Sequence, residues 1–283
     1  MLVSAIIVTY NSNVGKLTEI VTSMVSGVSF IIVDNSTDTV IKKNISEFCE
    51  MFSVKYLSMN GNCGIASAQN LGIQKSLELG ATDILFLDDD SVPDKFMLEN
   101  LVLGRNACFS YSSLMPIVCA NALNNGEKSL ADFGDEISAG IYKCRELISS
   151  GTLINEKHIS CIGVLEERLF IDCVDFEWGW RAQSLGFDIY LIENALLMHR
   201  LGEGTANFIS IKYPSPIRHY YQYRNILLML TRGYVPLSWK ISQAIKLPTK
   251  FILIFLLLDN KIIRGKYAIK GVVDFFKRKF GSI

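Results

Sequence analysis

The sequence has no excess of charge of either sign, because 28 Lys and Arg residues balance 28 Asp and Glu residues in a chain of 283. Proteins that bind nucleic acid through its phosphates usually carry a basic excess, so this balance argues against a general nucleic-acid binder. Long apolar runs are missing too. The longest, Phe251–Leu258, is far shorter than the roughly 20 residues that span a bilayer, so we expect no transmembrane helix.

Several familiar local signatures are also absent. The amino terminus lacks the basic region and cleavage site of a signal peptide, so Val3–Val8 is expected to be a first strand. The seven cysteines include no Cys-x-x-Cys pair and no metal-finger spacing, which indicates reduced thiols of a cytosolic protein. The turn Thr9–Asn13 has no glycine and no Walker sequence occurs, which disfavours a Rossmann dehydrogenase and a P-loop NTPase.

The first third of the chain instead alternates strands and helices. Hydrophobic periodicity predicts strands at Val3–Val8, Phe30–Val33, Val54–Leu57 and Ile84–Leu87, and helices at Val14–Val25, Ile41–Phe52 and Ile65–Leu79. Repeats of this kind imply an α/β protein with a mostly parallel sheet and right-handed crossovers. With 49% hydrophobic residues the chain has ample material for a core.

Three consecutive carboxylates, Asp88, Asp89 and Asp90, follow the fourth predicted strand. Ligands of open α/β sheets bind at the carboxyl ends of the strands, and an Asp-x-Asp spacing turns two side chains toward one point. Carboxylate oxygens suit Mg²⁺ or Mn²⁺, so Asp88 and Asp90 are candidate ligands. The alternative is a solvated acidic turn, which is common after strands.

Other polar loops are expected at the same edge: Thr9–Asn11, Asp34–Ser36 and Asn60–Gly64. Tyr10 can stack on a base, and Asp34 can accept hydrogen bonds from a base or ribose. Each signal alone is weak, because Asp and Asn at strand ends are usually turn formers.

The middle of the chain is less regular. The sequence predicts a helix from Pro93 to about Arg105, a strand at Met115–Ala120, a mobile polar loop at Asn121–Gly140, and a short helix between Gly151 and Gly163.

A second informative stretch begins at Asp172, a predicted N-cap for a helix that runs to Leu185. Asp175 would lie in its first turn, where the helix dipole favours an ionised carboxylate. Glu177 and Arg181 are spaced to pair along the helix. The alternative is that Asp175 only completes a capping box.

His199 is the one histidine in a suggestive setting. It follows the strand-like segment Ala195–Met198 and precedes the glycine-rich turn Leu201–Gly204, so it could complete a cation site. A lone histidine is more often structural.

Taken together, these segments resemble the family-two, GT-A-fold inverting glycosyltransferases over about residues 3 to 232. The resemblance rests on five motifs in order: Ile7–Asn11, Ile32–Ser36, Asn60–Ala66 with Asn70–Gly72, Leu87–Asp90, and Phe170–Asp172 with Asp175–Trp178 and Arg181. The Asp175-x-Glu177-Trp178 form and the later Tyr220–Asn225 are most similar to bacterial rhamnosyltransferases of surface-polysaccharide assembly.

The resemblance implies a single displacement, with Asp175 as the base that deprotonates the acceptor hydroxyl. It implies a divalent metal, Mg²⁺ or Mn²⁺, held by Asp88, Asp90 and His199, since His199 matches a metal-site histidine of the similar galactofuranosyltransferases. The implied nucleotide-binding residues are Thr9, Tyr10, Asn11, Asp34, Asn62 and Asp88, and the implied acceptor-binding residues are Trp178, Glu177 and Arg224. The Gln-x-x-Arg-Trp signature of processive synthases is absent, so we expect transfer of one or a few sugars.

The expected donor is dTDP-L-rhamnose and the expected acceptor a glycan on a polyprenyl diphosphate, with a UDP-galactofuranose or UDP-hexose donor as the alternative. Two other classes stay open. A nucleotidyltransferase would share strand-end acids and a metal but would usually begin with a glycine-rich basic loop, and a non-catalytic sugar-nucleotide-binding protein would bind donor without turnover.

The sequence also predicts a division into a nucleotide-sugar-binding and catalytic domain at 1–206 and a helical, basic region at 207–283. From Lys240 onward there are ten basic residues and two acids, a net charge of +8. A basic amphipathic segment binds anionic lipid, so we expect a cytoplasmic protein bound peripherally to the inner face of the cell membrane. The alternative is that this segment packs on the acidic surface of the body.

Overall fold

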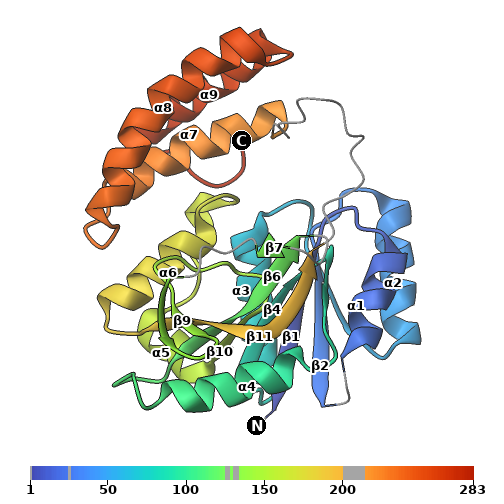
Figure 1. Ribbon diagram of the computed structural model, residues 1–283. Coiled ribbons are helices and arrows are strands. Elements are labelled where there is room, and N and C mark those ends of the chain that lie inside the picture. Colours follow the sequence, from blue (N-terminus) through green and yellow to red (C-terminus); the bar gives the residue numbers. More distant parts are fainter. Residues whose placement is uncertain (1, 25–26, 125–127, 130–133, 200–213) are drawn as a thin grey trace.

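The computed structural model describes residues 2–24, 27–124, 128–129, 134–199 and 214–283. A sheet with helices on both faces forms the body (Figure 1). Its eleven described strands run in the order β3-β2-β1-β4-β10-β6-β11-β9-β8, with β5 paired to β11 and β7 to β6. The strands are β1 Val3–Thr9, β2 Val28–Asp34, β3 Lys55–Ser58, β4 Asp83–Asp88, β5 Ser91–Pro93, β6 Ile117–Asn124, β7 Lys128–Ser129, β8 Asp135–Ser138, β9 Ile141–Lys143, β10 Thr152–Asn155 and β11 Ile189–His199.

The helices of the body are α1 Val14–Ser23, α2 Thr39–Met51, α3 Ile65–Glu78, α4 Met97–Cys108, α5 Glu156–Ile162 and α6 Val174–Ser184, with a short 3₁₀ helix at Glu167–Leu169. Alternate residues of a strand point to opposite faces, and β1 shows how this builds two cores. Ala5 and Ile7 pack in the layer that contains α1, α2 and α4, whereas Ile6 packs in the layer that contains α3, α5 and α6. The predicted α/β architecture is therefore confirmed.

The parallel half of the sheet aligns its carboxyl ends. Thr9 of β1 is in register with Asp34 of β2, Asp34 with Ser58 of β3, and Val8 with Asp88 of β4. The polar loops that follow these strands consequently lie at one edge of the sheet, as the alternation of strands and helices predicted.

Two predictions for the middle of the chain were wrong. The segment Asn121–Gly140 was expected to be a loop, but its described residues include the end of β6 and the strands β7 and β8; β8 forms a hairpin with β9 that turns at Gly140, where φ is +73°. The strand β10 was missed because it is a four-residue run that is buried on both faces and carries no periodicity. β10 pairs antiparallel to both β4 and β6, so it interrupts the parallel order.

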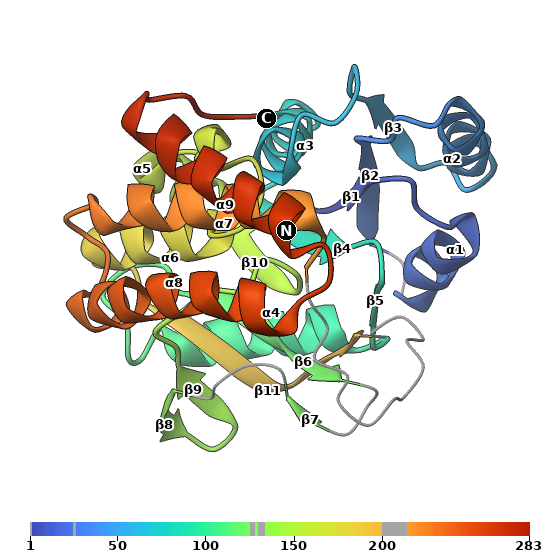
Figure 2. The same cartoon turned by 90° about the horizontal axis from the view of Figure 1, so that it is seen from above.

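Three helices, α7 Pro216–Leu230, α8 Leu237–Leu257 and α9 Lys261–Phe276, lie above the carboxyl ends of the strands (Figures 1 and 2). α7 and α9 approach closely because Gly271 has no side chain: a Cβ there would lie 2.3 Å from the carbonyl oxygen of Tyr220. Tyr223, Leu247 and Ala268 form the core that the three helices share. Within the described residues, none of the helices combines the length and the apolarity that crossing a bilayer requires. The predicted domain boundary at 206/207 lies outside the described residues.

Candidate active site

The three Asp residues at the end of β4 have different hydrogen-bond partners. Asp89 accepts a hydrogen bond from the hydroxyl of Ser12, in the loop after β1. The backbone N–H of Asp88 donates to Oγ of Ser150, at 2.9 Å. Asp90 accepts a hydrogen bond from the hydroxyl of Ser91, at 3.4 Å.

Asp88 and Asp89 are costly to ionise. Burial, together with the charges of Asp90, Asp89 and Asp175, raises the pKa of Asp88 to about 7. Burial also raises the pKa of Asp89, although the hydroxyl of Ser12 opposes that shift. The negative charges of these carboxylates repel one another, and this repulsion raises their pKa values. A divalent cation would relieve it, so the cluster suits such an ion.

Asp175 lies in the first turn of α6, as predicted, and its negative charge acts on Asp88. Burial raises the pKa of Asp175 to about 6, although it accepts hydrogen bonds from backbone N–H groups, including that of Phe176 at 3.0 Å and that of Ser149. Desolvation therefore outweighs the helix dipole, which favours the ionised carboxylate. Ser149 and Ser150 connect Asp175 to Asp88, so the two stretches singled out in the sequence meet in space.

The turn that leads into α6 is strained. Phe170, Asp172 and Cys173 have φ angles of +65°, +64° and +66°, which residues other than glycine rarely adopt. The helix starts with Cys173 at the N-cap position and no side-chain cap, so the prediction of Asp172 as N-cap was wrong. The Asp172 carboxylate instead pairs with Arg218 of α7, at 2.8 Å.

α7 holds this strained turn from above. The side-chain amide of Asn225 donates to the carbonyl oxygens of Leu169, Ile171 and Asp172, at 2.8, 2.7 and 3.1 Å. Arg224 donates to the carbonyl oxygens of Arg168 and Leu169, at 3.0 and 3.1 Å. Both side chains are fully buried, so α7 is part of the framework that positions Asp175.

The residues predicted to bind the nucleotide fall into two groups. Tyr10 is 50% exposed and Asn62 is exposed, so both are accessible at the sheet edge. Thr9 and Asp34 are fully buried, and the Thr9 hydroxyl donates to Asp34 at 2.9 Å. The second oxygen of Asp34 accepts from the Tyr56 hydroxyl, also at 2.9 Å, so Asp34 organises the edge rather than lining its surface.

Asn11 links the first two loops. Its backbone N–H donates to Oγ of Ser36 at 2.8 Å, and its side-chain oxygen accepts from the N–H groups of Thr37 and Asp38. This bridge fixes the loop that carries Tyr10 to the loop after β2.

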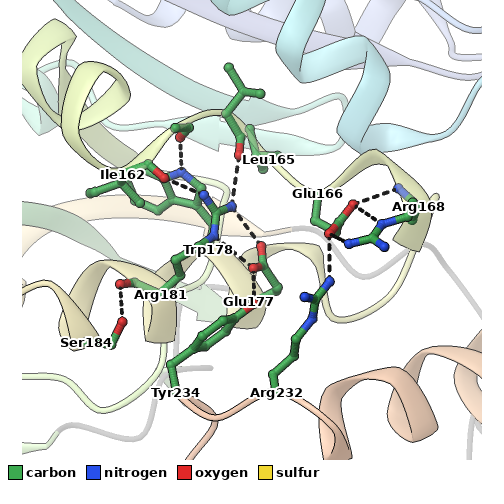
Figure 3. Close-up of polar contacts among 12 residues, drawn as sticks. Ile162, Leu165, Glu166, Arg168, Glu177, Trp178, Arg181, Ser184, Arg232 and Tyr234 are labelled. Carbon is green, nitrogen blue, oxygen red and sulfur yellow. Dashed lines mark hydrogen bonds and ion pairs between the residues drawn. The ribbon is translucent and has the colours of Figure 1, made fainter.

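The residues predicted to bind the acceptor are internal, and the predictions for them were wrong. The Trp178 ring is 3% exposed and its N–H donates to the carbonyl oxygen of Gly163, so it offers no platform for a sugar (Figure 3). Glu177 is 2% exposed and pairs with Arg181, as the spacing predicted, and it also accepts from the Tyr234 hydroxyl. Arg224 is occupied by backbone carbonyls.

The backbone of His199 lies beside the acidic turn, since His199 is in register with Ser91 across β5 and β11. Its side chain lies outside the described part of the structure. Among the side chains that are described, no group of three or more His, Cys, Asp and Glu is arranged to hold a metal ion. The metal role of His199, Asp90 and Asp88 stays a prediction, which the register supports.

Sequence reasoning missed several residues that build this site. Each of these residues contacts one of the acids through a single hydroxyl or backbone group: Ser12, Ser149, Ser150 and Tyr56. Residues with hydroxyl groups are too common in loops to be recognised as site residues from the sequence. Asn225 ends the Tyr220–Asn225 motif, but no local pattern connects it with Asp175.

Comparison with known proteins agrees with this geometry. The model of the family "Glycosyl transferase family 2" matches residues 4–104, from β1 into α4. The chain is 29% identical to the dTDP-rhamnosyl transferase RfbF of Shigella flexneri, over 95% of this chain and 94% of that protein.

Solved structures with the same fold include two glycosyltransferases. S. aureus TarS 1-349 in complex with UDP-GlcNAc superposes with a TM-score of 0.59 at 14% identity, over 98% of this chain and 81% of that one. GalNAc-T7 with UDP, GalNAc and Mn²⁺ superposes with a TM-score of 0.60 at 12% identity, over 86% of this chain and 54% of that one. At such identities these likenesses establish the fold alone. The chain therefore resembles the glycosyl transferase family 2 enzymes over residues 4–104, and it has a GT-A fold.

Proposed function

We propose that this protein is a glycosyltransferase that transfers L-rhamnose from dTDP-rhamnose, with inversion, to a lipid-linked glycan in bacterial surface-polysaccharide assembly. The choice of donor is supported by the similarity to a dTDP-rhamnosyl transferase, which extends over nearly the whole of both chains. The observation that carries the reaction type is the proximity of Asp175 to the acids at the end of β4.

Asp175 is the proposed general base. Its carboxylate lies at the start of α6 with a pKa raised to about 6, so at neutral pH it is mostly ionised yet holds a proton better than an exposed Asp does. The strained turn and Asn225 fix its position, and the nearby backbone N–H groups orient it. It would take the proton of the acceptor hydroxyl as that oxygen attacks the anomeric carbon.

Asp88, Asp90 and His199 are the residues that would hold a divalent cation. When bound there, Mg²⁺ or Mn²⁺ would neutralise the diphosphate leaving group. The chain's own part is to supply oxygen ligands from β4 and to keep Asp89 turned toward Ser12. Tyr10 and Asn62, which are exposed at the same edge, would contact the nucleotide.

The proposed membrane contact is the outer face of α8 and α9. Apolar side chains lie exposed along both helices at helical spacing, among them Leu256 at 71% and Phe276 at 74%. The full set is Leu237, Ile241, Ile245, Ile252, Leu253, Phe255, Leu256 and Leu257 on α8, and Ile262, Ile263, Ile269, Val273 and Phe276 on α9. Exposed basic residues flank it, at Lys246, Lys250, Lys261, Lys266, Lys277, Arg278 and Lys279. Apolar residues bordered by positive charge suit the surface of an anionic bilayer, and the like charges oppose pairing of two copies.

A panel of sugar nucleotides tests the donor. Purified protein is incubated with dTDP-rhamnose, UDP-galactofuranose, UDP-glucose and UDP-GlcNAc, with and without Mn²⁺, and thermal unfolding and release of nucleoside diphosphate are measured. We expect dTDP-rhamnose with Mn²⁺ to raise the melting temperature most, because a ligand that binds only the native state stabilises it. Turnover of a UDP-sugar without turnover of dTDP-rhamnose would refute the donor assignment, and binding without turnover of any donor would favour a non-catalytic role.

A further inference from the structure

A cleft of about 580 Å³ opens between α6 and the first half of α8, apart from the acidic edge of the sheet. The start of α8 and α6 lie side by side in Figures 1 and 2. The lining residues are Arg145, Glu146, Phe176, Trp180, Gln183, Pro236, Ser238, Trp239, Ser242, Gln243 and Lys246. Nothing in the reaction described above uses this cleft.

The walls combine aromatic rings, neutral hydrogen-bonding groups and the charged side chains of Arg145, Glu146 and Lys246. Phe176 and Trp239 are partly exposed, and Trp180, which is 2% exposed, packs against both: the rings of Phe176 and Trp180 lie 5.6 Å apart and those of Trp180 and Trp239 lie 5.0 Å apart. Amide and hydroxyl groups come from Gln183, Gln243 and other α8 residues. Sugar rings have apolar C–H faces and a rim of hydroxyls, so a wall of rings with a few placed polar groups matches a saccharide.

One cleft-lining residue has a polar atom without a partner among the described residues. The side-chain oxygen of Gln243 is buried, and no donor in the described part of the chain lies within hydrogen-bonding distance. Burying an acceptor without a partner costs about 1–3 kcal/mol, so such an atom is expected where a ligand supplies the missing donor. A sugar hydroxyl is a donor of this kind.

The cleft also begins beside the proposed base. Phe176 follows Asp175 in the first turn of α6, and Phe176, Trp180 and Gln183 line the cleft along one side of that helix. At 1.5 Å per residue this wall is about 10 Å long, roughly the length of two sugar rings.

α8 separates the cleft from the proposed lipid-facing surface. Ser238, Trp239, Ser242 and Gln243 line the cleft, whereas Leu237, Ile241 and Ile245 are exposed on the neighbouring side of the same helix. A glycan whose lipid is in the bilayer would therefore have a short path around α8 into the cleft.

We propose that the cleft between α6 and α8 is the acceptor site and binds the one or two sugars next to the hydroxyl that is glycosylated. The inference rests on the proposed function for the identity of the ligand as an acceptor. It replaces the roles expected for Trp178, Glu177 and Arg224, which are internal, by Trp239, Gln243 and their neighbours.

Two variants test the site and a third controls them. Ser242→Phe fills the cleft, and Gln243→Leu removes the unpartnered oxygen at nearly constant size. Ala244→Phe places the same ring as the first variant two residues along α8, where the helix is exposed. Because Gln243→Leu removes a buried acceptor without a partner, its melting temperature should equal or exceed that of the wild type, whereas a purely structural glutamine would lower it.

Binding is measured without turnover by tryptophan fluorescence, since two of the three tryptophans, Trp180 and Trp239, line the cleft. The probes are soluble methyl glycosides and disaccharides of rhamnose, glucose, galactose and N-acetylglucosamine. We expect at least one probe to bind the wild type and Ala244→Phe alike, and about tenfold or more weaker to Ser242→Phe and Gln243→Leu. Equal binding by all four proteins, or no binding of any probe to the wild type, overturns the proposal.

Turnover with dTDP-rhamnose and the best-bound saccharide gives an independent readout. Ser242→Phe and Gln243→Leu should raise the acceptor KM about tenfold or more and leave the donor KM unchanged. If the wild type binds saccharide in the cleft but transfers no sugar from any donor, the proposed function fails while the cleft assignment stands. If transfer occurs and both variants keep the wild-type acceptor KM, the cleft assignment fails while the proposed function stands.

Discussion

Asn225 of α7 donates a hydrogen bond of 2.7 Å to the carbonyl oxygen of Ile171, four residues before the proposed base Asp175. The same amide donates to the carbonyl oxygens of Leu169 and Asp172, so a single side chain of α7 fixes the turn that precedes α6. The geometry of Asp175 thus depends on a helix about fifty residues later in the chain.

Asn225→Ala should reduce turnover more than it reduces donor binding. The variant releases three carbonyl groups of a turn in which three residues have unfavourable φ angles, so Asp175 is expected to move. Misplacement of about 1 Å can cost about 100-fold in rate. We expect kcat to fall by about 10- to 100-fold with a nearly unchanged donor KM, measured by release of nucleoside diphosphate.

Asn106→Ala, an exposed position of α4, is the matched control and should leave kcat unchanged. If Asn225→Ala lowers the melting temperature but keeps the wild-type kcat, α7 only stabilises the protein and does not position the base.

Asp175→Asn should abolish most of the activity while preserving the fold. The substitution keeps the size of the side chain but removes its ability to take a proton, which typically costs about 10²- to 10⁴-fold in rate. Asp172→Asn makes the same chemical change three residues earlier, on a carboxylate that pairs with Arg218, and should cost far less. Near-normal turnover of Asp175→Asn with intact donor binding would place the base elsewhere.

The pH dependence of kcat should follow the ionisation of Asp175. Its pKa in the folded protein is raised to about 6, so the active carboxylate is lost as the pH falls through that value, and kcat should drop about tenfold for each further pH unit. A pH–rate profile between pH 5 and 8 measures this directly. A profile that stays flat down to pH 5 would contradict the assignment.

The raised pKa also has a consequence for stability. A carboxyl group with a raised pKa binds a proton more tightly in the folded state, so its contribution favours folding at low pH and is lost as the pH rises through about 6. Asp175→Asn avoids the cost of ionisation, so at pH 8 its free energy of unfolding should exceed that of the wild type by about 1–3 kcal/mol. This difference in stability should shrink below pH 5, where the wild-type carboxyl is protonated.

Metal dependence should be sensitive to Asp90 and His199. His199→Ala and Asp90→Asn are each expected to weaken metal-dependent turnover by about 10- to 100-fold, partly restored by excess Mn²⁺, because loss of one ligand lowers affinity rather than abolishing the site. Titration of Mn²⁺ into the enzyme with donor present gives the half-saturating concentration. His199→Ala with an unchanged half-saturating concentration would return this histidine to a structural role.

Vesicle binding should depend on the exposed apolar face of α8 and α9. Ile245→Asp and Leu256→Asp each place a charge among the side chains that would enter the lipid, and each should reduce sedimentation with anionic vesicles about tenfold or more. Leu103→Asp replaces an exposed leucine of α4 and serves as the control. Equal binding of all variants, or equal binding to neutral and anionic vesicles at rising salt, would contradict a membrane contact built from both apolar and basic residues.

The parallel half of the sheet was predictable from the sequence because each element there carries its own signal. β1, β2 and β4 are apolar runs that end in Thr9, Asp34 and Asp88, and the strand register alone brings those ends together. β10 could not be predicted in the same way, since four buried residues have neither a period nor a polar face.

The chemistry of the site was predictable in part. Asp88, Asp90 and Asp175 stood out by residue type and position, but the burial that raises the pKa of Asp175 arises from the packing of several elements. The internal position of Trp178 could not be predicted from the sequence either. A tryptophan next to an acidic residue has the same sequence whether its ring packs inward or faces solvent. Long-range partners such as Asn225 are set by tertiary structure and not by local pattern.

The hydrogen bonds from Arg224 and Asn225 of α7 clamp the turn before α6. This clamp also affects when the enzyme becomes able to catalyse its reaction during synthesis of the chain. A chain that the ribosome has made only as far as α6 already contains both acidic stretches, yet Phe170, Asp172 and Cys173 have nothing to hold them in their unfavourable conformations. Arg224 additionally donates to the carbonyl oxygen of Gly281, so the clamp needs residues beyond α9. Catalytic competence should thus arrive as one of the last steps of folding, after the helices beside the proposed membrane surface have formed, and a nascent chain should be unable to consume donor before it can meet its acceptor.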